Sequence, residues 1–589
     1  MEFNEKDNPH LIKTGEGFNV LNTVFYKEKF LYSKYNPQKT ILKTIQDLKI
    51  LPNTIILICS PALWYGINEL LEKLPENCKV IAVEFDRKLY ELAESEFSKL
   101  EISEETKLQV RFYNFFQLMQ LDDYLREIVK SGDFKRILKI NFSSGVQFEN
   151  QKYEELTNGM QEIISVFWKN RITLQKMGKL FTKNTIRNLC KLKNNLQLSD
   201  VQNTIEKNIL ICGAGESLDY FYDWDKVKDN FFVISVDAAT KALCAKNVIP
   251  DAIVALESQF AIQKSYIGLK NYFKQKEPIF FSDLSSRSEI SNLFTKKVFF
   301  LSKFSDCNFI AQLKNLNIAK DFVEPLGSVG LLAVYLALKL RKSSNTKIFV
   351  LGLDFAFTKG RTHAKNTQAT IQRFLENSKF SALENLTACF SNDAFSFKDK
   401  KNNLAFSNKA LSSYANQFKT FFSNEKNLFD CGDFGIDLGL KHNFEISENK
   451  FKNQTGTKSF DNKLTDKEFY AKFENPLISE NLKTKIDEFY SSEIKSLEEA
   501  LSLLKNGENS EFRNKKISLD EQICELLVPR DYLYLHFPDG QKFHTETSFL
   551  KRIRAELVFF IKQFKLAVNL EQKKSAKFCH SAFSSESVI

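Results

Sequence analysis

The stretch Ile209–Asp219 reads ILICGAGESLD. Its first four residues are apolar, as in a strand that is buried on both faces, and Gly213-Ala214-Gly215 follows directly. Ser217 stands where a helix is expected to begin, and it could cap that helix or bind a phosphate oxygen. Glycines in such a turn bring backbone amides close to a ligand. The stretch predicts a strand, a tight turn and a helix in an α/β domain, with or without a bound phosphate.

Further apolar runs follow on both sides of this stretch, and helical patterns separate most of them. The expected strands are Lys207–Cys212, Phe231–Val236, Ala252–Leu256, Pro278–Phe281, Val298–Leu301 and Lys347–Leu351. This alternation predicts an α/β fold with a doubly wound, mostly parallel sheet. Ligands of such folds bind at the carboxyl edge of the sheet, where the loops after the strands lie.

Acidic residues follow two of these strands. Asp237 ends the second strand, and Glu257 follows the third, which Pro250-Asp251 precedes. Each acid alone would be read as a cap or a turn residue. Because both reach the same expected edge, they are candidates for binding ribose or sugar hydroxyls, which donate hydrogen bonds to carboxylates.

A second glycine-containing turn, Gly327-Ser328-Val329-Gly330, precedes the apolar helical run Leu331–Leu340. Gly327 permits the turn and Ser328 stands at the N-cap position, so a second helix start is available to an anion. The next strand leads into Asp354 and then His363. Histidine titrates near neutrality, so His363 could deprotonate a hydroxyl or offer charge to a departing phosphate.

The first 200 residues are expected to form a Rossmann-like domain. Ile55–Cys59 and Lys79–Glu84 read as strands around a helix, and Glu84 stands where a ribose-binding acid would be. The loop between them, Ser60–Gly66, lacks the glycine-rich pattern, which favours a fold without a bound cofactor. We therefore expect three parts: a Rossmann-like domain at 1–200, a central α/β domain at 201–455 and a helical region at 456–589.

Composition excludes several classes of protein. The formal net charge of +10 comes from lysines that are scattered along the chain, which argues against nucleic acid as a partner. The ten cysteines contain no CxxC pair, which argues against a structural zinc site and favours a reducing compartment. The opening residues MEFNEKDNPH lack an apolar signal core, and no apolar stretch approaches the ~20 residues that span a bilayer. We expect a cytoplasmic protein with no membrane partner.

Five ordered pieces of the chain together resemble the motility-associated factor (Maf) family of flagellin glycosyltransferases. They are GAGESLD at 213–219, VDAATKAL at 236–243, IPDAIVALE at 249–257, GSVGLLAVYLAL at 327–338 and LGLDFAFTKGRTHAKNT at 351–367. The central domain of that family is similar to bacterial CMP-sialic-acid sialyltransferases. The resemblance is specific over residues 205–370 and looser at 31–39 and 173–189.

The resemblance implies transfer of a nonulosonic acid (pseudaminic, legionaminic or sialic-type) from its CMP donor to Ser or Thr hydroxyls of flagellin, as needed for motility. It implies that Gly213, Ala214, Gly215 and Ser217 lie at the nucleotide, and that Asp237 and Glu257 face the ribose or sugar. Gly327 and Ser328 would hold the cytidine or phosphate, with Asp354 and His363 near the reacting centre.

Two positions depart from the family pattern: Glu216 stands where a proline is usual, and Glu257 where Asp is common. The central block contains no DxD pair, since Asp122-Asp123 lies in the first domain, so we expect transfer without a metal or other cofactor. Two alternatives remain open. One is a pterin pyrophosphokinase-like enzyme on a related fold, and the other is a non-catalytic module that binds or chaperones flagellin.

Overall fold

The computed structural model describes residues 8–14, 20–100, 109–221, 224–380, 387–442, 466–474, 476, 478–506 and 516–583. The chain forms two compact units, Met1–Gln175 and Lys176–Ile589. The expected helical region at 456–589 falls within the second unit together with the central α/β domain. The three-part division of the chain stays a prediction.

The first unit contains a parallel four-stranded sheet in the order β6-β5-β4-β7 and a small antiparallel sheet, β1-β2-β3. Its strands are β1 (His10–Thr14), β2 (Leu21–Tyr26), β3 (Lys29–Phe30), β4 (Thr54–Cys59), β5 (Lys79–Glu84), β6 (Val110–Asn114) and β7 (Arg136–Asn141). Its helices are α1 (Lys39–Asp47), α2 (Ile67–Glu72), α3 (Arg87–Ser98), α5 (Leu118–Lys130) and the first part of α6 (Asn150–Leu192). The predicted Rossmann-like arrangement is confirmed, because β4 is central and fully buried between its neighbours.

The second unit is built on a ten-stranded sheet whose described pairings are all parallel. The strand order is β14-β13-β12-β11-β10-β9-β15-β18-β19, with β8 beside β13. The strands are β8 (Leu196–Gln197), β9 (Asn208–Cys212), β10 (Phe231–Val236), β11 (Ala252–Ala255), β12 (Ile279–Asp283), β13 (Lys297–Ser302), β14 (Phe322–Val323), β15 (Ile348–Leu351), β18 (Leu428–Asp430) and β19 (Lys441–His442). The chain proceeds outward from β9 to β14 and then returns to the other side of β9, which makes the sheet doubly wound, as predicted.

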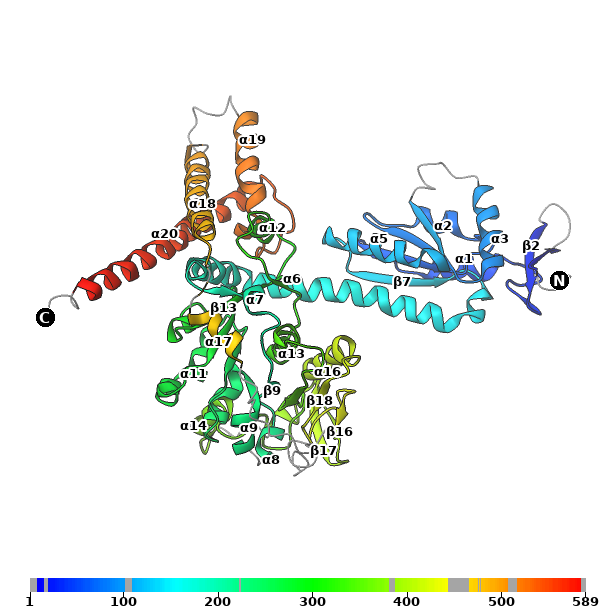
Figure 1. The fold of residues 1–589 in the computed structure, drawn as a ribbon. Coiled ribbons are helices and arrows are strands. Elements are labelled where there is room, and N and C mark those ends of the chain that lie inside the picture. The colour runs from blue at the N-terminus through cyan, green and yellow to red at the C-terminus, as the bar shows by residue number, and fades with distance from the viewer. Residues whose placement is uncertain are drawn as a thin grey trace. The chain divides into compact units, whose positions relative to one another are not determined.

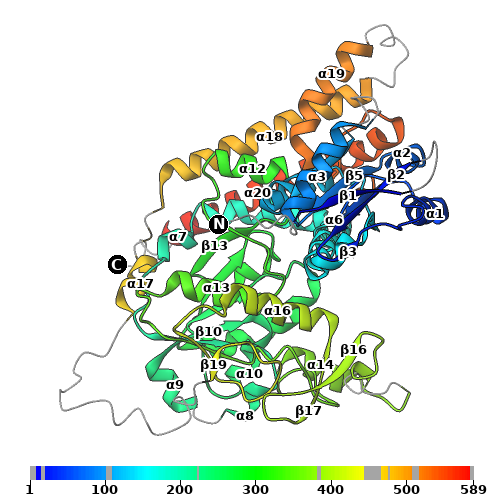
Figure 2. The same cartoon turned by 90° about the vertical axis from the view of Figure 1, so that its right-hand side faces the viewer.

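Helices cover this sheet, and the apolar helix α13 (Val329–Leu340) packs on it across β9, β10, β11 and β15 (Figures 1 and 2). The other helices around the sheet are α7 (Leu198–Val201), α8 (Ser217–Tyr220), α9 (Trp224–Asn230), α10 (Thr240–Cys244), α11 (Gln263–Tyr266), α12 (Asn308–Asn315), α14 (Gln368–Glu376), α16 (Lys409–Phe422) and α17 (Lys467–Glu474). A hairpin of β16 (Ala394–Lys398) and β17 (Leu404–Asn408) follows α14. Leu331, Leu332 and Leu336 of α13 join the inward-facing strand residues in one core, which explains why this helix is apolar almost all round.

The second unit also contains three further helices near the end of the chain: α18 (Glu480–Asn506), α19 (Lys516–Leu527) and α20 (Thr547–Phe583). They pack on one another, and a buried ion pair between Arg530 and Glu493 lies among them, with Tyr532 donating a hydrogen bond of 2.7 Å to Glu493. The predicted amphipathic helix at Ile486–Leu504 lies inside α18. Among the residues that the structure describes, no helix is both long and apolar enough to span a bilayer.

Candidate active site

The direction of winding reverses between β9 and β15, and two glycine-containing loops meet there. Cys212 of β9 lies opposite Leu351 of β15, and the next residues are Gly213 and Gly352. A Cβ atom added to Gly213 would lie 2.3 Å from the carbonyl oxygen of Gly352, and one added to Gly352 would lie 2.3 Å from that of Gly213. The crevice beside such a reversal is where open α/β sheets bind ligands. The glycines are therefore required by the close approach of two loops at that point.

A buried carboxylate holds the two loops together. Asp354 accepts hydrogen bonds from the Ser217 amide (2.9 Å) and from the Ser217 hydroxyl (2.5 Å), and the same hydroxyl accepts one from the Gly352 amide (2.9 Å). Asp354 is only 2% exposed, and burial raises its pKa to about 7, although the hydrogen bonds from Ser217 act in the opposite direction. In this structure Asp354 connects the loops rather than facing solvent, and its catalytic role stays a prediction.

The expectation that Ser217 caps a helix is wrong. Glu216 is the N-cap residue of α8, its side chain makes no capping hydrogen bond, and α8 is only four residues long. The Ser217 hydroxyl is instead engaged by Asp354, which is 137 residues away in sequence. The outer part of the turn is accessible: Ala214 and Gly215 are partly exposed, and the Ala214 amide has no hydrogen-bond partner among the described residues. Contact of these residues with a nucleotide stays a prediction.

The second glycine turn lies beside the first, and Leu353 contacts both. Gly327 has a φ of +68°, and the side chain of Ser328 caps α13 by accepting a hydrogen bond from the Gly330 amide at 3.2 Å, as predicted. Leu353 connects the two turns. Its Cδ2 lies 2.6 Å from the position that a Cβ atom added to Gly213 would take, and 2.6 Å from the corresponding position at Gly330. The start of α13 therefore lies against the loops of β9 and β15.

Asp237 and Glu257 lie close together at the neighbouring part of the carboxyl edge. Asp237 is 4% exposed, and burial, with a smaller effect of the Glu257 charge, raises its pKa to about 7. Its Oδ1 accepts a hydrogen bond of 2.7 Å from the Ala238 amide. Glu257 is exposed, so it can meet a ligand directly. Sequence reasoning missed Tyr266, whose buried hydroxyl has no hydrogen-bond partner among the described residues and whose pKa is raised by burial and by Asp237.

His363 lies in the segment that follows Asp354, next to the first glycine turn. The amide of Ala364 donates a hydrogen bond of 2.9 Å to the Ala214 carbonyl. The His363 Nδ1 is 3.0 Å from the Thr362 hydroxyl, which also contacts Arg373. Burial, together with the Arg373 charge, lowers the pKa of His363 to about 4. His363 is therefore neutral at pH 7 in this structure, which disfavours the expectation that it offers positive charge to a phosphate.

The departure at Glu216 has a structural explanation. Its carboxylate is fully buried and accepts hydrogen bonds from the Thr358 amide (3.0 Å) and hydroxyl (2.6 Å). Arg361 lies 3.9 Å from the same carboxylate and forms a 3.2 Å ion pair with Asp219. The charge of Glu216 thus anchors the segment that carries His363.

At the carboxyl edge of the Rossmann-like unit the acidic residue is buried, unlike Glu257 in the second unit. Glu84 is buried, accepts hydrogen bonds from Ser60 (2.7 Å) and Tyr153 (3.1 Å), and has a pKa raised to about 7 by burial. Ser143, after β7, donates a hydrogen bond of 3.0 Å to Ser60. The acid that could bind a ribose is thus occupied by hydrogen bonds within its own domain, and the expectation of no cofactor there stays a prediction.

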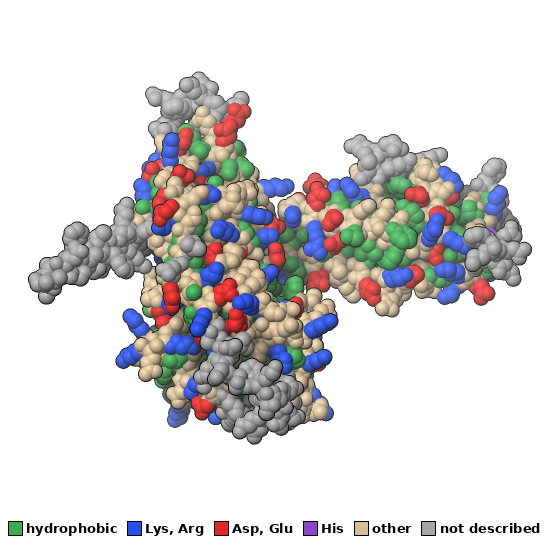
Figure 3. Space-filling view, viewed as in Figure 1, with side chains coloured by type: hydrophobic (Ala, Val, Ile, Leu, Met, Phe, Trp, Pro, Cys, Tyr) green, Lys and Arg blue, Asp and Glu red, His purple; other side chains and the backbone are tan. Residues whose placement is uncertain are grey.

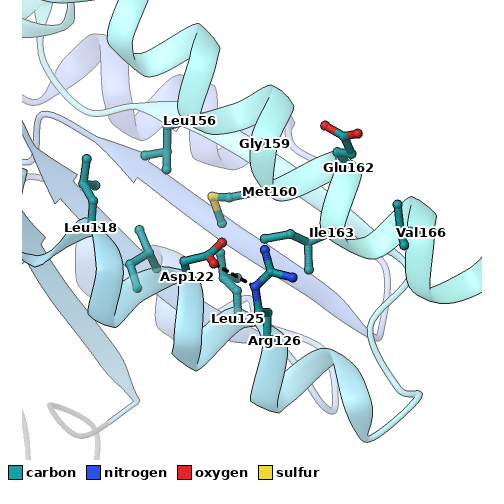
Figure 4. A pocket seen from close by; sticks show the side chains of 11 residues that line it. Leu118, Asp122, Leu125, Arg126, Leu156, Gly159, Met160, Glu162, Ile163 and Val166 are labelled. Carbon is teal, nitrogen blue, oxygen red and sulfur yellow. Dashed lines mark hydrogen bonds and ion pairs between the residues drawn. The ribbon is translucent and has the colours of Figure 1, made fainter. Parts of the chain in front are cut away.

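The first unit also contains a groove of about 420 Å³. Apolar side chains of α5 and α6 line it, among them Leu125, Met160 and Ile163, and Asp122 and Arg126 form an ion pair at its edge (Figure 4). Hydrophobic side chains gather on the visible face of this unit (Figure 3). Among the described residues, no group of three or more His, Cys, Asp or Glu is placed to hold a metal ion.

Three comparisons with known proteins bear on these observations. An uncharacterised protein of Treponema pallidum (strain Nichols) is 30% identical over 569 residues, which cover 94% of each chain. Residues 183–360 match a family model described as 6-hydroxymethylpterin diphosphokinase MptE-like. The MAf glycosyltransferase from Magnetospirillum magneticum AMB-1 has a similar structure, with a TM-score of 0.55 over 96% of this chain and 92% of that chain at 15% sequence identity. This last likeness shows a shared fold.

Proposed function

The chain belongs to the same family as the uncharacterised Treponema pallidum protein. We propose that it is a glycosyltransferase. Its proposed donor is a CMP-activated nonulosonic acid, and its proposed acceptors are Ser or Thr hydroxyls of flagellin in the cytoplasm. The fold that it shares with a MAf glycosyltransferase supports the reaction class. The nature of the donor and of the acceptor rests on the sequence resemblance described above.

One observation carries the proposal: Leu353 packs against both glycine turns at the point where the sheet reverses its winding. A nucleotide phosphate at that point would meet the free Ala214 amide on one side and the start of α13 on the other. The sugar would then extend along the carboxyl edge toward Asp237 and Glu257, because β10 and β11 follow β9 in the sheet.

The chemistry requires three events. The acceptor oxygen forms a bond to the anomeric carbon, the bond from that carbon to the CMP oxygen breaks, and the acceptor proton moves to a base. Helix-start and turn amides stabilise the charge on the departing phosphate without any metal. Two residues are candidates for the base: Asp237, which follows β10 at the carboxyl edge and whose pKa burial raises to about 7, and His363, whose pKa burial lowers to about 4.

The intact mass of flagellin tests this function. Flagellin is co-expressed with the chain in a host that supplies CMP-nonulosonic acids, and we expect its mass to rise by whole sugar units. Asp237→Asn and Ser328→Ala should reduce the increase, while Asn408→Ala, which removes the cap of α16 instead, should leave it in place. Unmodified flagellin that still co-purifies with the chain would favour the non-catalytic binding module.

The match of residues 183–360 to a pterin diphosphokinase-like family supports a second candidate function. Such an enzyme would transfer a diphosphate group from ATP to 6-hydroxymethylpterin and release AMP. Incubation with ATP, Mg²⁺ and the pterin separates the two candidates, since only the second produces AMP.

A further inference from the structure

The last part of α6 lies across the loops that follow β11 and β12. The Asn184 side-chain amide donates hydrogen bonds to the carbonyls of Ser258 (3.3 Å) and Ser285 (3.1 Å). One turn later, the Asn188 amide donates to the carbonyls of Leu284 and Ser286, both at 2.9 Å. Both asparagines are fully buried. These contacts fix the helix against the carboxyl edge of the sheet, next to the proposed sugar end of the site.

Three cations gather where this helix meets the loop after β12. Arg187 NH1 and Arg287 Nε lie 3.0 and 2.8 Å from the two carboxylate oxygens of Glu289, so one acid serves two guanidinium groups. The rest of the Arg187 fork donates to Gln563. Lys183 lies one helical turn before Arg187, on the same side of α6.

Positive charge at this point exceeds negative charge. Burial lowers the pKa of Lys183, and the charges of Arg187 and Arg287 lower it further, while Glu289 acts against them. The ammonium group of Lys183 forms no ion pair or hydrogen bond among the described residues. Like charges held this close destabilise one another unless an anion lies between them. An anionic group bound beside Lys183 and Arg287 would offset this excess of positive charge.

Arg287 connects this cluster to the proposed site. Its amide donates a hydrogen bond of 3.0 Å to the Glu257 carbonyl, and its guanidinium carbon lies 5.2 Å from the centre of the Phe260 ring. The Phe260 ring packs against the Arg287 guanidinium group, and Glu289 forms an ion pair with its Nε atom. The terminal nitrogens of such a fork are suited to a carboxylate, which they bind in bidentate fashion.

We propose that Lys183 and Arg287 form a subsite for the carboxylate of an acidic donor sugar. This inference rests on the proposed function, in which the two glycine turns already accommodate the nucleotide phosphate. The second anionic group of the donor is then the carboxylate of its sugar. This carboxylate would lie farther along the carboxyl edge than Asp237 and Glu257. The subsite selects acidic sugars over neutral ones, because a neutral sugar would leave the excess positive charge uncompensated.

Calorimetric titration of the intact chain with CMP and with CMP-N-acetylneuraminic acid tests this subsite. In the wild type, the sugar nucleotide should bind more tightly than CMP. Lys183→Gln and Arg287→Gln should each weaken binding of the sugar nucleotide about tenfold, the loss of one charged hydrogen bond, and change CMP binding by less than about twofold. Lys276→Gln removes a cation that pairs with Asp251 at the opposite, amino edge of β11, and it should change neither affinity.

The outcomes separate the subsite from the proposed function. If the wild type binds neither ligand, the proposed function fails. If CMP binds but the two variants leave sugar-nucleotide affinity unchanged, or weaken both ligands equally, the subsite is refuted. Retained CMP binding shows that a variant is folded. Should Arg287→Gln unfold, Lys183→Gln decides the question, because the Lys183 side chain makes no hydrogen bond or ion pair among the described residues that the substitution would remove.

Discussion

Gly213 and Gly352 approach each other so closely that neither has room for a side chain. In each case the obstacle is a backbone carbonyl oxygen, which cannot move aside like the end of a flexible side chain. The contact between these two residues limits how far apart the loops of β9 and β15 lie. Single residues therefore determine whether the proposed crevice forms at all.

Gly213→Ala should destabilise the second unit by about 1–3 kcal/mol, the usual cost of forcing atoms into a packed site. Denaturant unfolding followed by circular dichroism measures the change. Gly159→Ala is the matched control, because nothing lies within 4 Å of its Cβ position on α6. The control should be neutral or stabilising, since alanine favours a helix. Equal effects of the two substitutions would contradict the steric account.

Asp354 should give stability a specific pH dependence. Its folded-state pKa of about 7 lies above the ordinary value of 3.8, so the folded protein binds more protons than the unfolded chain between these values. The contribution of Asp354 is therefore complete below about pH 4 and is lost as the pH rises through about 7. The unfolding free energy of the wild type minus that of Asp354→Asn should fall by about 4 kcal/mol between pH 4 and 8. A difference that grows with pH would contradict the burial of this carboxyl group.

The pH profile of transfer distinguishes the two candidate bases. If Asp237 takes the proton, activity should rise as the pH increases through about 7, because the carboxylate form is required. If His363 does so, activity should be flat above about pH 5. Asp237→Asn should lower kcat about 100-fold or more while CMP still binds, and His363→Gln should have a smaller effect. The opposite ranking would assign the role of base to His363.

At the scale of elements, α13 is the helix on which the proposed site depends. Its apolar residues fix it on the sheet, and its start lies beside Leu353 and the glycine turns. Its N-terminal amides are held in place by the sheet and require no rearrangement to meet an anion. α8, by contrast, is a single turn and contributes little helix dipole.

Ser328→Ala should cost about 1 kcal/mol of stability and weaken CMP binding, because it removes the cap of α13. Asn408→Ala removes the equivalent cap of α16 at similar cost, and it should leave CMP binding unchanged. Thermal unfolding and calorimetric titration of both variants make the comparison. If Ser328→Ala and Asn408→Ala bind CMP with equal affinity, α13 does not contribute to binding of the nucleotide.

The sequence predicts these elements well where burial decides them. Phe231–Val236 and Lys79–Glu84 form strands with the expected bounds, because strands buried on both faces appear as continuous apolar runs. Residues 150–192 form one helix, whereas the short strands β8 and β14 carry no signal of their own in the sequence. The partners of buried polar groups are equally hidden: no local pattern connects Ser217 to Asp354, or Glu216 to Thr358.

At the scale of the whole molecule, two parallel sheets of similar plan differ in their carboxyl edges. In the first unit Ser60 and Ser143 close the edge around Glu84, whereas in the second unit Glu257 and the start of α13 leave it accessible. Presence of a Rossmann-like fold therefore does not identify a nucleotide site. The residues at the carboxyl edge determine whether a ligand has access to the sheet. Because this edge is accessible in the second unit, we propose that the chemistry takes place there.

We propose that the chain binds a CMP-linked sugar without a metal where the winding of the sheet reverses, between β9 and β15. Titration of the intact, EDTA-treated chain with CMP, and in parallel with ATP in the presence of Mg²⁺, tests it most directly. We expect CMP to bind to the EDTA-treated chain, Ser328→Ala to weaken that binding, and ATP with Mg²⁺ not to bind. Binding of ATP with Mg²⁺ but not of CMP would contradict the account and favour the diphosphokinase.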